Sequence, residues 1–417
     1  MKQSIRLDYG KTGLTVRLDG ADVIEPLEQP AAENPAALIG KKLYKPDFGP
    51  SLAHLAAGKR TAAVAHTDIT RATPNRLILP AVLGELRALG FEKENIVLVN
   101  MTGSHRPQTP AELADMLGGE TASAYRCVQH NAFDNSTMSC AGELDGYPLY
   151  VNKAYLQADL KICTGFIEPH FFAGFSGGPK AVLPGLCDIG SIMRNHNAAR
   201  IADDRATWAV TRGNPVWENI RDGCALAAPD FLLNVALNTH GEVSAVFAGS
   251  WEEAHRKGCE FVREHAMRKT DKLYDMVITS NSGYPLDMNL YQCVKAMSCA
   301  AQIVRDGGII VVAGECSDGL PKGSPYEKIL KTARTPEELF DLIVSGKETL
   351  PEQWQAQIQA RIQKRARVFV YAGCLSDDEI KQALLEPCRD IEALVREYGG
   401  SVAVLPKGPQ TVPCCVS

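Results

Sequence analysis

The sequence predicts an α/β fold made of two domains, each with a largely parallel sheet. Short apolar stretches alternate with longer segments in which apolar residues recur at helical spacing. This alternation is typical of chains that run from strand to helix to parallel strand. The length of 417 residues also exceeds what a single ordinary core occupies and suffices for two or three domains.

Three strands are predicted in the first half of the chain, and each is followed by a polar loop. Residues 60–65 form the first strand, and residues 74–89 form a helix after it. Residues 95–100 and 158–163 form the next two strands. Loops after the carboxyl ends of parallel strands carry the site in such folds. We therefore expect function in the three loops that follow these strands.

A second α/β block is predicted from about residue 271. Its strands cover 274–279, 309–313, 367–371 and 401–404, and helices over 336–344 and 377–385 lie between them. The charged run at 268–272 marks the boundary. We predict an N-terminal domain over 1–270 and a C-terminal domain over 271–404, with the tail 405–417 packing back on the first domain. A cleft between two α/β domains is the default place for a ligand, so we expect the active site there.

The composition limits the classes of partner. Charged residues make up 22%, the net charge is −5, and Lys and Arg form no block, which argues against nucleic acid or an anionic membrane surface. No stretch approaches the roughly 18 consecutive apolar residues of a membrane helix, and the first twenty residues lack the apolar run of a signal peptide. We expect a cytoplasmic protein whose thirteen cysteines are reduced.

Residues 66–74 place an imidazole, a carboxylate, hydroxyls and a guanidinium at the end of the first strand. Arg71 could hold a carboxylate through two parallel hydrogen bonds. Asp68 and Thr70 could bind ribose or phosphate oxygens near a helix start. The alternative is that Asp68 or Thr70 only caps the following helix.

The loop over 168–180 is the most unusual stretch, with three aromatic residues, a histidine, a lysine and several glycines. It is not a nucleotide-triphosphate loop, because no Ser or Thr follows Lys180, and it is not a GxGxxG fingerprint. A lysine after a Gly-Gly-Pro turn suits covalent attachment of a carbonyl-containing group. The alternative is a surface lysine that closes a flexible loop. His105, on the turn over 102–107, is either catalytic or structural on local grounds.

Two further groups of residues could bind a metal or a substrate. His196 lies between two asparagines, and an imidazole is a common ligand for nickel, zinc or copper. No HxH or HExxH pattern accompanies it, so further metal ligands would have to come from elsewhere. Gln292 and Lys295 lie one helical turn apart and share a face, although Lys295 could equally be a solvated helix residue.

Taken together, these segments resemble the nickel-pincer-nucleotide lactate racemase family, in order and spacing and over nearly the whole chain. The matching segments are HTDITRATP (66–74), TGSHRP (102–107), EPHFFAGFSGGPKAVLPG (168–185), NHN (195–197) and YQCVK (291–295), and Trp354 matches a pocket tryptophan.

The resemblance implies a cofactor and a role for each matching residue. Lys180 would hold a pyridinium-3,5-bisthiocarboxylic acid mononucleotide covalently, and nickel would be bound by that cofactor and by His196. His105 and His170 would be the paired acid and base. The substrate would be surrounded by Arg71, Tyr291, Gln292, Lys295 and Trp354. The nucleotide would be seated by Asp68, Thr70, Ser176, Gly177 and Gly178.

The resemblance also implies an activity, the racemisation or epimerisation of a 2-hydroxy acid. The cofactor would accept and return a hydride, and the two histidines would move the hydroxyl proton. Lactate is one candidate substrate, and malate or a sugar acid such as gluconate is an alternative within the family. Proteins that make the cofactor would be transient partners. Readings from other classes are an NAD-dependent 2-hydroxy-acid dehydrogenase, disfavoured by the missing GxGxxG, and a non-catalytic cofactor carrier.

Overall fold

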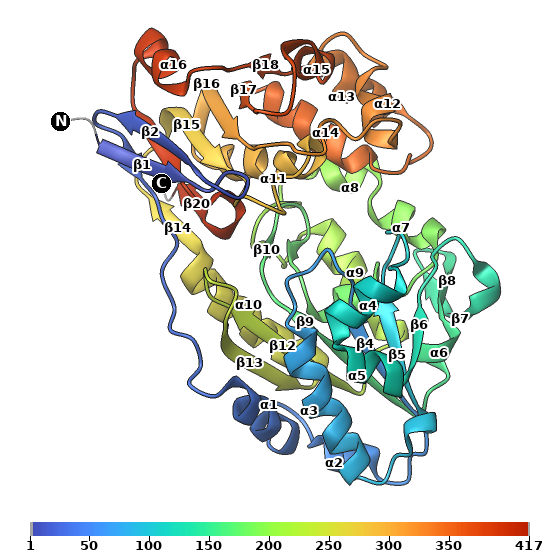
Figure 1. The fold of residues 1–417 in the computed structure, drawn as a ribbon. Helices are drawn as coiled ribbons and strands as arrows, with labels where there is room; N and C mark the ends of the chain where they lie inside the picture. The colour runs from blue at the N-terminus through green and yellow to red at the C-terminus, as the bar shows by residue number, and fades with distance from the viewer. Residues whose placement is uncertain (1–2, 416–417) are drawn as a thin grey trace. The chain divides into compact units, whose positions relative to one another are not determined.

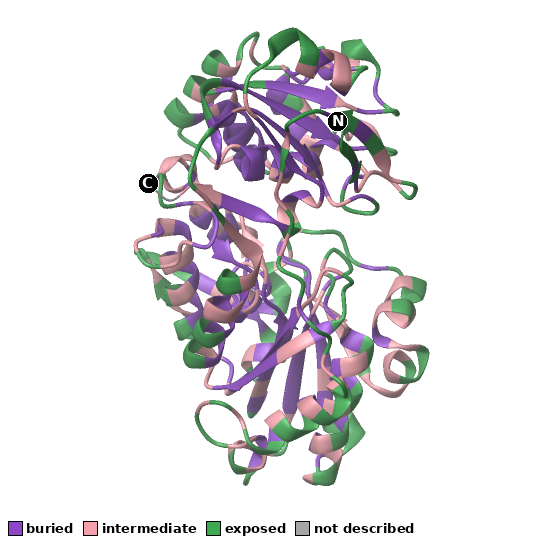
Figure 2. Cartoon of the chain, turned by 90° about the vertical axis from the view of Figure 1, so that its left-hand side faces the viewer, coloured by how far each residue is buried: buried purple, intermediate pink, exposed green. Residues whose placement is uncertain are grey.

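The computed structural model describes residues 3–415 as alternating strands and helices (Figure 1). The strands at the centre of each sheet are buried, and the exposed residues lie mainly on helices and loops (Figure 2). Such near-continuous burial is typical of parallel sheets covered on both faces. The predicted α/β fold with largely parallel sheets is confirmed.

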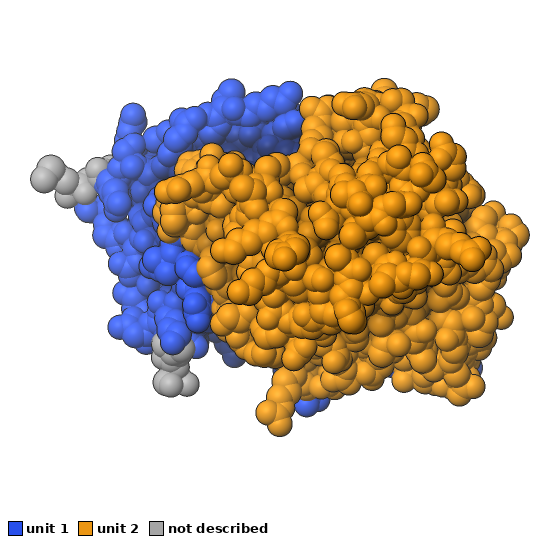
Figure 3. Space-filling model, turned by 90° about the horizontal axis from the view of Figure 1, so that it is seen from below, with its two compact units in different colours: residues 1–27, 196–208, 264–417 blue, residues 28–195, 209–263 orange. Residues whose placement is uncertain are grey.

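The chain divides into two compact units, coloured separately in Figure 3. Unit 2 comprises residues 28–195 and 209–263, and unit 1 comprises residues 1–27, 196–208 and 264–417. Both units are therefore discontinuous in sequence, whereas the predicted domains were continuous ranges that met at residue 270.

Unit 2 is built on a six-stranded sheet in the order β13-β12-β9-β4-β5-β6. Its strands are β4 (Ala62–Thr67), β5 (Ile96–Met101), β6 (Arg126–Gln129), β9 (Leu160–Phe166), β12 (Phe231–Leu237) and β13 (Val243–Gly249). The edge pair β12–β13 is antiparallel and the other four neighbouring pairs are parallel. The strands β9, β4 and β5 are thus adjacent, and their carboxyl ends lie at one edge of the sheet.

Helices and two small hairpins complete unit 2. The helices are α1 (Pro35–Tyr44), α2 (Leu52–Ala56), α3 (Asn75–Ala88), α4 (Pro110–Leu117), α5 (Gly119–Ala124), α6 (Lys153–Leu156), α7 (Ile189–Asn195), α9 (Pro215–Leu226) and α10 (Trp251–Ala266), which continues past the boundary of the unit. The hairpins are β7 (Met138–Leu144) with β8 (Tyr147–Asn152), and β10 (Pro169–His170) with β11 (Gly174–Phe175). The single-turn helices are η1 (Lys93–Asn95), η2 (Asn135–Thr137) and η3 (Gly178–Ala181). In α3, Leu79, Val82 and Leu86 recur at helical spacing and are fully buried in the core of the unit.

Unit 1 contains a second six-stranded sheet, ordered β18-β17-β16-β15-β19-β3 and parallel throughout. Its strands are β3 (Asp22–Val23), β15 (Tyr274–Ser280), β16 (Val304–Ala313), β17 (Arg367–Tyr371), β18 (Glu386–Pro387) and β19 (Val402–Leu405). The N-terminal hairpin β1 (Gln3–Leu7) with β2 (Leu14–Leu18) contributes Ile5, Leu7 and Val16 to the same core as β15 and β16.

The remaining elements of unit 1 are short helices and one strand pair. The helices are α8 (Ala198–Ala202), α11 (Leu290–Ala300), α12 (Pro325–Leu330), α13 (Pro336–Ser345), α14 (Gln353–Gln363), α15 (Asp377–Gln382), α16 (Ile391–Tyr398) and η4 (Gly408–Gln410). The tail strand β20 (Val412–Cys415) pairs with β14 (Met267–Thr270), and both belong to unit 1. Among residues 3–415, no helix is both long enough and apolar enough to cross a membrane.

Candidate active site

The predicted site residues of unit 2 follow the three adjacent strands β9, β4 and β5. Asp68, Thr70 and Arg71 come after β4, His105 comes after β5, and the segment with His170 and Lys180 comes after β9. Because these strands are parallel neighbours, their carboxyl ends bring the three loops to one edge of the sheet.

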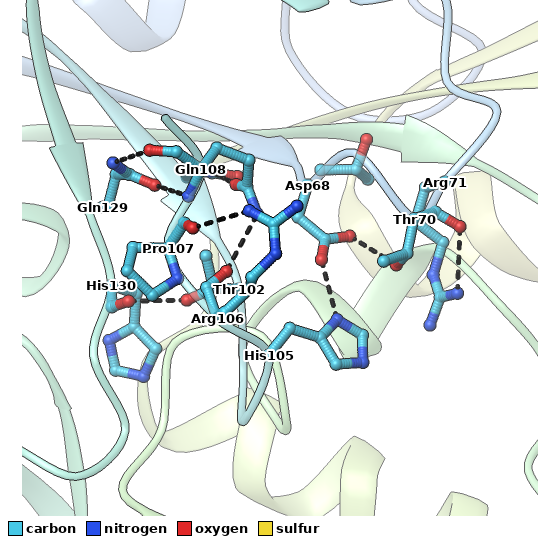
Figure 4. A network of polar contacts seen from close by, with 12 residues as sticks. Asp68, Thr70, Arg71, Thr102, His105, Arg106, Pro107, Gln108, Gln129 and His130 are labelled. Carbon is cyan, nitrogen blue, oxygen red and sulfur yellow. Dashed lines mark hydrogen bonds and ion pairs between the residues drawn. The ribbon is translucent and has the colours of Figure 1, made fainter. Parts of the chain in front are cut away.

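Asp68 and His105 form a hydrogen-bonded pair, although 37 positions separate them. His105 Nδ1 lies 2.7 Å from Asp68 Oδ2, and the Thr70 hydroxyl donates to the other carboxylate oxygen at 2.8 Å (Figure 4). Burial raises the pKa of Asp68, but the hydrogen bond from His105 and the nearby positive charges outweigh it and lower the pKa. The carboxylate is therefore ionised while its residue is only 2% exposed.

These contacts bear on the helix-cap alternative for the segment over 66–74. Within the described chain, no side chain caps the first turn of α3, and Pro74 occupies its N-cap position. The oxygens of Asp68 and Thr70 are engaged with each other and with His105 instead. Asp68 is thus part of a hydrogen-bonded pair and does not act as a helix cap.

The turn that carries His105 is held from both sides. Thr102 donates its hydroxyl hydrogen to the His130 carbonyl at 2.6 Å (Figure 4), and Gln108 bonds the side chain of Asn100. Thr109 caps α4 in a reciprocal bond with its third residue, which fixes the far end of the turn. The His105 side chain remains 46% exposed on this fixed turn.

His170 ends strand β10 of the small hairpin after β9. The backbone N–H of Ala173 donates to His170 Nδ1 at 3.2 Å. The rings of Phe171 and Phe172 lie 5.0 and 4.6 Å from the imidazole centroid, the second in an edge-to-face arrangement. These contacts orient a half-buried imidazole.

Lys180 lies in the single-turn helix η3 and is half-buried, with its Nζ 5.8 Å from the centroid of the Phe172 ring. Its backbone is tied to the turn that carries His105. Gly103 N donates to the Gly185 carbonyl at 3.1 Å, and Gly185 N donates to the Lys180 carbonyl at 3.1 Å. The loop after β5 and the loop after β9 are therefore connected by backbone hydrogen bonds.

The turn before Lys180 is clamped by two residues that sequence reasoning missed, Asn234 and His255. Asn234 Oδ1 accepts the Gly178 N–H at 2.8 Å, and the His255 Nε2 lies 3.0 Å from the Ser176 carbonyl. A Cβ on Gly178, which has a φ of +51°, would lie 2.3 Å from the His255 ring. Both residues are buried, so periodicity alone gave them the appearance of ordinary core positions. Gly258, one turn after His255 on α10, was the available sign that this helix face packs closely.

The other predicted site residues belong to unit 1. His196 is 6% exposed, and its ring lies 4.8 Å from that of Trp354, which is 8% exposed on α14. Tyr291, Gln292 and Lys295 lie half-buried in the first turns of α11. The site residues therefore divide between the two units, and the expected cleft that would bring them together stays a prediction.

The ends of β4 and β5 offer several buried hydrogen-bonding atoms to a polar group. Among the described residues, buried polar atoms without a protein partner gather where β4 and β5 end: His66 Nε2, Thr67 Oγ1, Thr73 Oγ1, Asn75 Oδ1 and Asn100 Oδ1. Buried polar atoms generally have partners, so unmet ones indicate a ligand or water. The described part of the chain holds no group of three or more His, Cys, Asp or Glu side chains placed to bind a metal.

Comparison with known proteins identifies the class. The Lactate racemase N-terminal domain family matches residues 9–209, and the Lactate racemase C-terminal domain family matches residues 269–407. A lactate racemase of Thermoanaerobacterium thermosaccharolyticum is 34% identical over 98% of this chain and 99% of its own length. One from Lactiplantibacillus plantarum is 33% identical over 97% of this chain and 98% of its own length. The fold and these relatives define an isomerase of the racemase class. The chain belongs to the lactate racemase family.

Two solved structures share the fold, and the first also agrees with the family assignment. The lactate racemase apoprotein from Thermoanaerobacterium thermosaccharolyticum superposes with a TM-score of 0.93 at 33% identity, covering 99% of this chain and all of that one. A Thermotoga maritima protein superposes with a TM-score of 0.70 at 18% identity, covering 91% of this chain and 98% of that one, which shows a shared fold.

Proposed function

We propose that the chain racemises lactate or a closely related 2-hydroxy acid. The observation that carries the proposal is the convergence in unit 2: the Asp68–His105 pair, His170 and Lys180 follow the carboxyl ends of three adjacent parallel strands. Two histidines and one lysine on tied loops suit a reaction that moves a proton beside a tethered cofactor. The names of the two relatives support lactate as the first substrate to test.

The proposal includes a nickel-pincer nucleotide held covalently by Lys180, with His196 as the protein ligand of the nickel. Thr70 and the turn over 176–178 would seat the nucleotide beside the unpartnered polar atoms of Thr73 and Asn75. When bound, this group supplies a carbon that accepts a hydride from the carbinol carbon and returns it. A cytoplasmic location and transient contact with cofactor-synthesis proteins complete the proposal, and the thirteen free thiols are consistent with that location.

The residues of the chain itself bind the acid and move its hydroxyl proton. Arg71 and Lys295 hold the carboxylate, since a guanidinium and an ammonium both pair with it. Tyr291, Gln292 and Trp354 surround the rest of the substrate. One imidazole takes the hydroxyl proton, so that an O–H bond breaks and an N–H bond forms, and an imidazole returns a proton to the oxygen on the way back. His105 and His170 are the two groups proposed for this task.

The test uses protein produced together with the cofactor-synthesis proteins. Intact-mass measurement should show an adduct on the chain, which Lys180→Arg should abolish. A single enantiomer of lactate should lose its optical activity in the presence of the loaded protein, and malate and gluconate extend the panel. A loaded protein that racemises none of these acids would defeat the proposal, and loading of Lys180→Arg would remove the lysine from its role.

A further inference from the structure

The imidazoles of His105 and His170 have different hydrogen-bond partners at Nδ1. His105 Nδ1 faces a carboxylate oxygen of Asp68 at 2.7 Å, whereas His170 Nδ1 accepts the backbone N–H of Ala173 at 3.2 Å. An ionised carboxylate only accepts hydrogen bonds and a backbone N–H only donates. The hydrogen on each neutral ring is therefore fixed by its partner.

We propose that Asp68 and the Ala173 N–H hold the two histidines in opposite tautomers, so that they are not equivalent in proton transfer. His105 has its hydrogen on Nδ1 and a lone pair on Nε2. His170 has its lone pair on Nδ1 and its hydrogen on Nε2. This inference rests on the proposed role of both histidines and adds a division of labour between them.

The surroundings of Asp68 support this role. Both carboxylate oxygens are engaged, one by His105 and one by the Thr70 hydroxyl, and the residue is 2% exposed. A buried, acceptor-only group of this kind fixes the tautomer of a histidine and stabilises the imidazolium that forms when Nε2 takes a proton. We therefore assign Asp68 as a positioning residue for His105.

The tautomers make the resting enzyme ready for one enantiomer. His105 Nε2 can take a hydroxyl proton at once, while His170 Nε2 can only donate a hydrogen bond. For His170 to accept a proton at Nε2, its hydrogen must move to Nδ1 and the bond from Ala173 must break. The free energies of two enantiomers are equal, so kcat/KM is the same for both. This shift lies on the one reversible path that links the two enantiomers, so its cost enters the rate in both directions.

The test reads the tautomers directly, by long-range ¹H–¹⁵N correlation spectra of the full chain labelled with ¹⁵N-histidine, near pH 8.5 where imidazoles are mostly neutral. His105→Gln and His170→Gln assign the two signals. The expected result is a hydrogen on Nδ1 of His105 and on Nε2 of His170. The same tautomer at both rings would overturn the inference.

Variants of Asp68 test the positioning role. Asp68→Asn and the similarly sized Asp68→Leu remove the acceptor-only group, so His105 should lose its preference and shift toward a hydrogen on Nε2. Asp230→Asn is the matched control, because Asp230 bonds the backbone of Lys161 near the opposite ends of the strands. An unchanged His105 tautomer in Asp68→Leu would sink the role of Asp68.

Spectra and rates together separate this inference from the proposed function. The same tautomer at both rings, in a loaded protein that racemises lactate and needs both histidines, would defeat the division of labour and leave the racemase proposal standing. Opposite tautomers in a loaded protein whose His105→Gln and His170→Gln variants racemise at full rate would instead support the tautomers and defeat the proposed role in proton transfer.

Discussion

The imidazole of His255 lies directly against the backbone of Gly178, where a Cβ would come within 2.3 Å of its ring. The same ring bonds the Ser176 carbonyl. The turn before Lys180 thus packs against His255, which lies 75 positions further along the chain than Lys180. The contribution of this packing can be tested apart from catalysis.

Replacing Gly178 by alanine should destabilise unit 2 and impair loading of Lys180. The added methyl group meets a buried ring, and the φ of +51° is unfavourable for any side chain, so we expect a loss of about 2 kcal/mol or more. Chemical unfolding measures the stability, and intact mass measures the adduct. Gly84→Ala in α3 is the control, because its Cβ meets no described atom within 4 Å and alanine favours a helix. Wild-type stability in Gly178→Ala would contradict the close packing.

Asn234 should stabilise the turn before Lys180 through its Oδ1, which accepts the Gly178 N–H. Asn234→Leu leaves that buried N–H without a partner, which costs about 1–3 kcal/mol. Asn234→Asp keeps an acceptor oxygen and should restore most of the loading at Lys180. Equal loading in the leucine and aspartate variants would show that the hydrogen bond does not position the turn.

Stability should fall between about pH 6.5 and pH 4 because of two buried histidines. Burial lowers the pKa of both His66 and His255 to about 4, and the charge of Lys180 adds to the effect at His255. The unfolded chain then binds more protons than the folded chain in this window, so stability is fully present above pH 6.5 and is lost as the pH falls. Each histidine contributes on the order of 3 kcal/mol.

The contribution of His255 can be isolated by substitution. His255→Gln keeps a donor for the Ser176 carbonyl but does not titrate, so the pH dependence of the unfolding midpoint should become shallower by about one proton near pH 5. The exposed His54, replaced by Gln, serves as the control. An unchanged slope in His255→Gln would mean that this imidazole is not held neutral.

Nickel retention should depend on His196 while attachment of the cofactor should not. His196→Ala removes an imidazole that the Trp354 ring orients at 4.8 Å, and Lys180 is left untouched. Elemental analysis should show loss of nickel, and intact mass should still show the adduct. The exposed His240, replaced by Ala, is the control. Full nickel occupancy in His196→Ala would exclude this histidine as the ligand.

Local periodicity predicted seven strands and three helices, because the form of such elements depends on neighbours in the sequence. Strand β17 has the predicted bounds, 367–371, and helix α3 differs by one residue at each end from the predicted range of 74–89. Helix α15 ends at Gln382 instead of 385, where Leu384 has a φ of +60° that a helix cannot continue through. The end of such a helix depends on the backbone dihedral angles of a single residue, and the spacing of apolar residues does not indicate those angles.

Pairing between distant residues could not be predicted in the same way. The motifs at 66–74 and 102–107 were recognised as polar clusters after strands, but the bond between Asp68 and His105 depends on β4 and β5 being neighbours. The grouping of residues 1–27 with the C-terminal part likewise depends on sheet contacts across most of the chain. Contacts between residues far apart in the chain produce no periodic pattern in a single sequence, so they could not be predicted from it.

The hairpin β1–β2 and the strand β3 have a consequence for how the protein is made. Their partners in unit 1 lie beyond residue 264, and β3 pairs with β19, which begins at Val402. During synthesis residues 1–27 therefore cannot complete their sheet contacts until β19 has left the ribosome. Residues 28–263, in contrast, include every segment of unit 2, so this unit can fold earlier. A nascent chain stopped near residue 300 should thus have a folded unit 2, while its N-terminal strands β1 to β3 still lack their partners in unit 1. Chaperones and proteases should be able to bind that exposed segment.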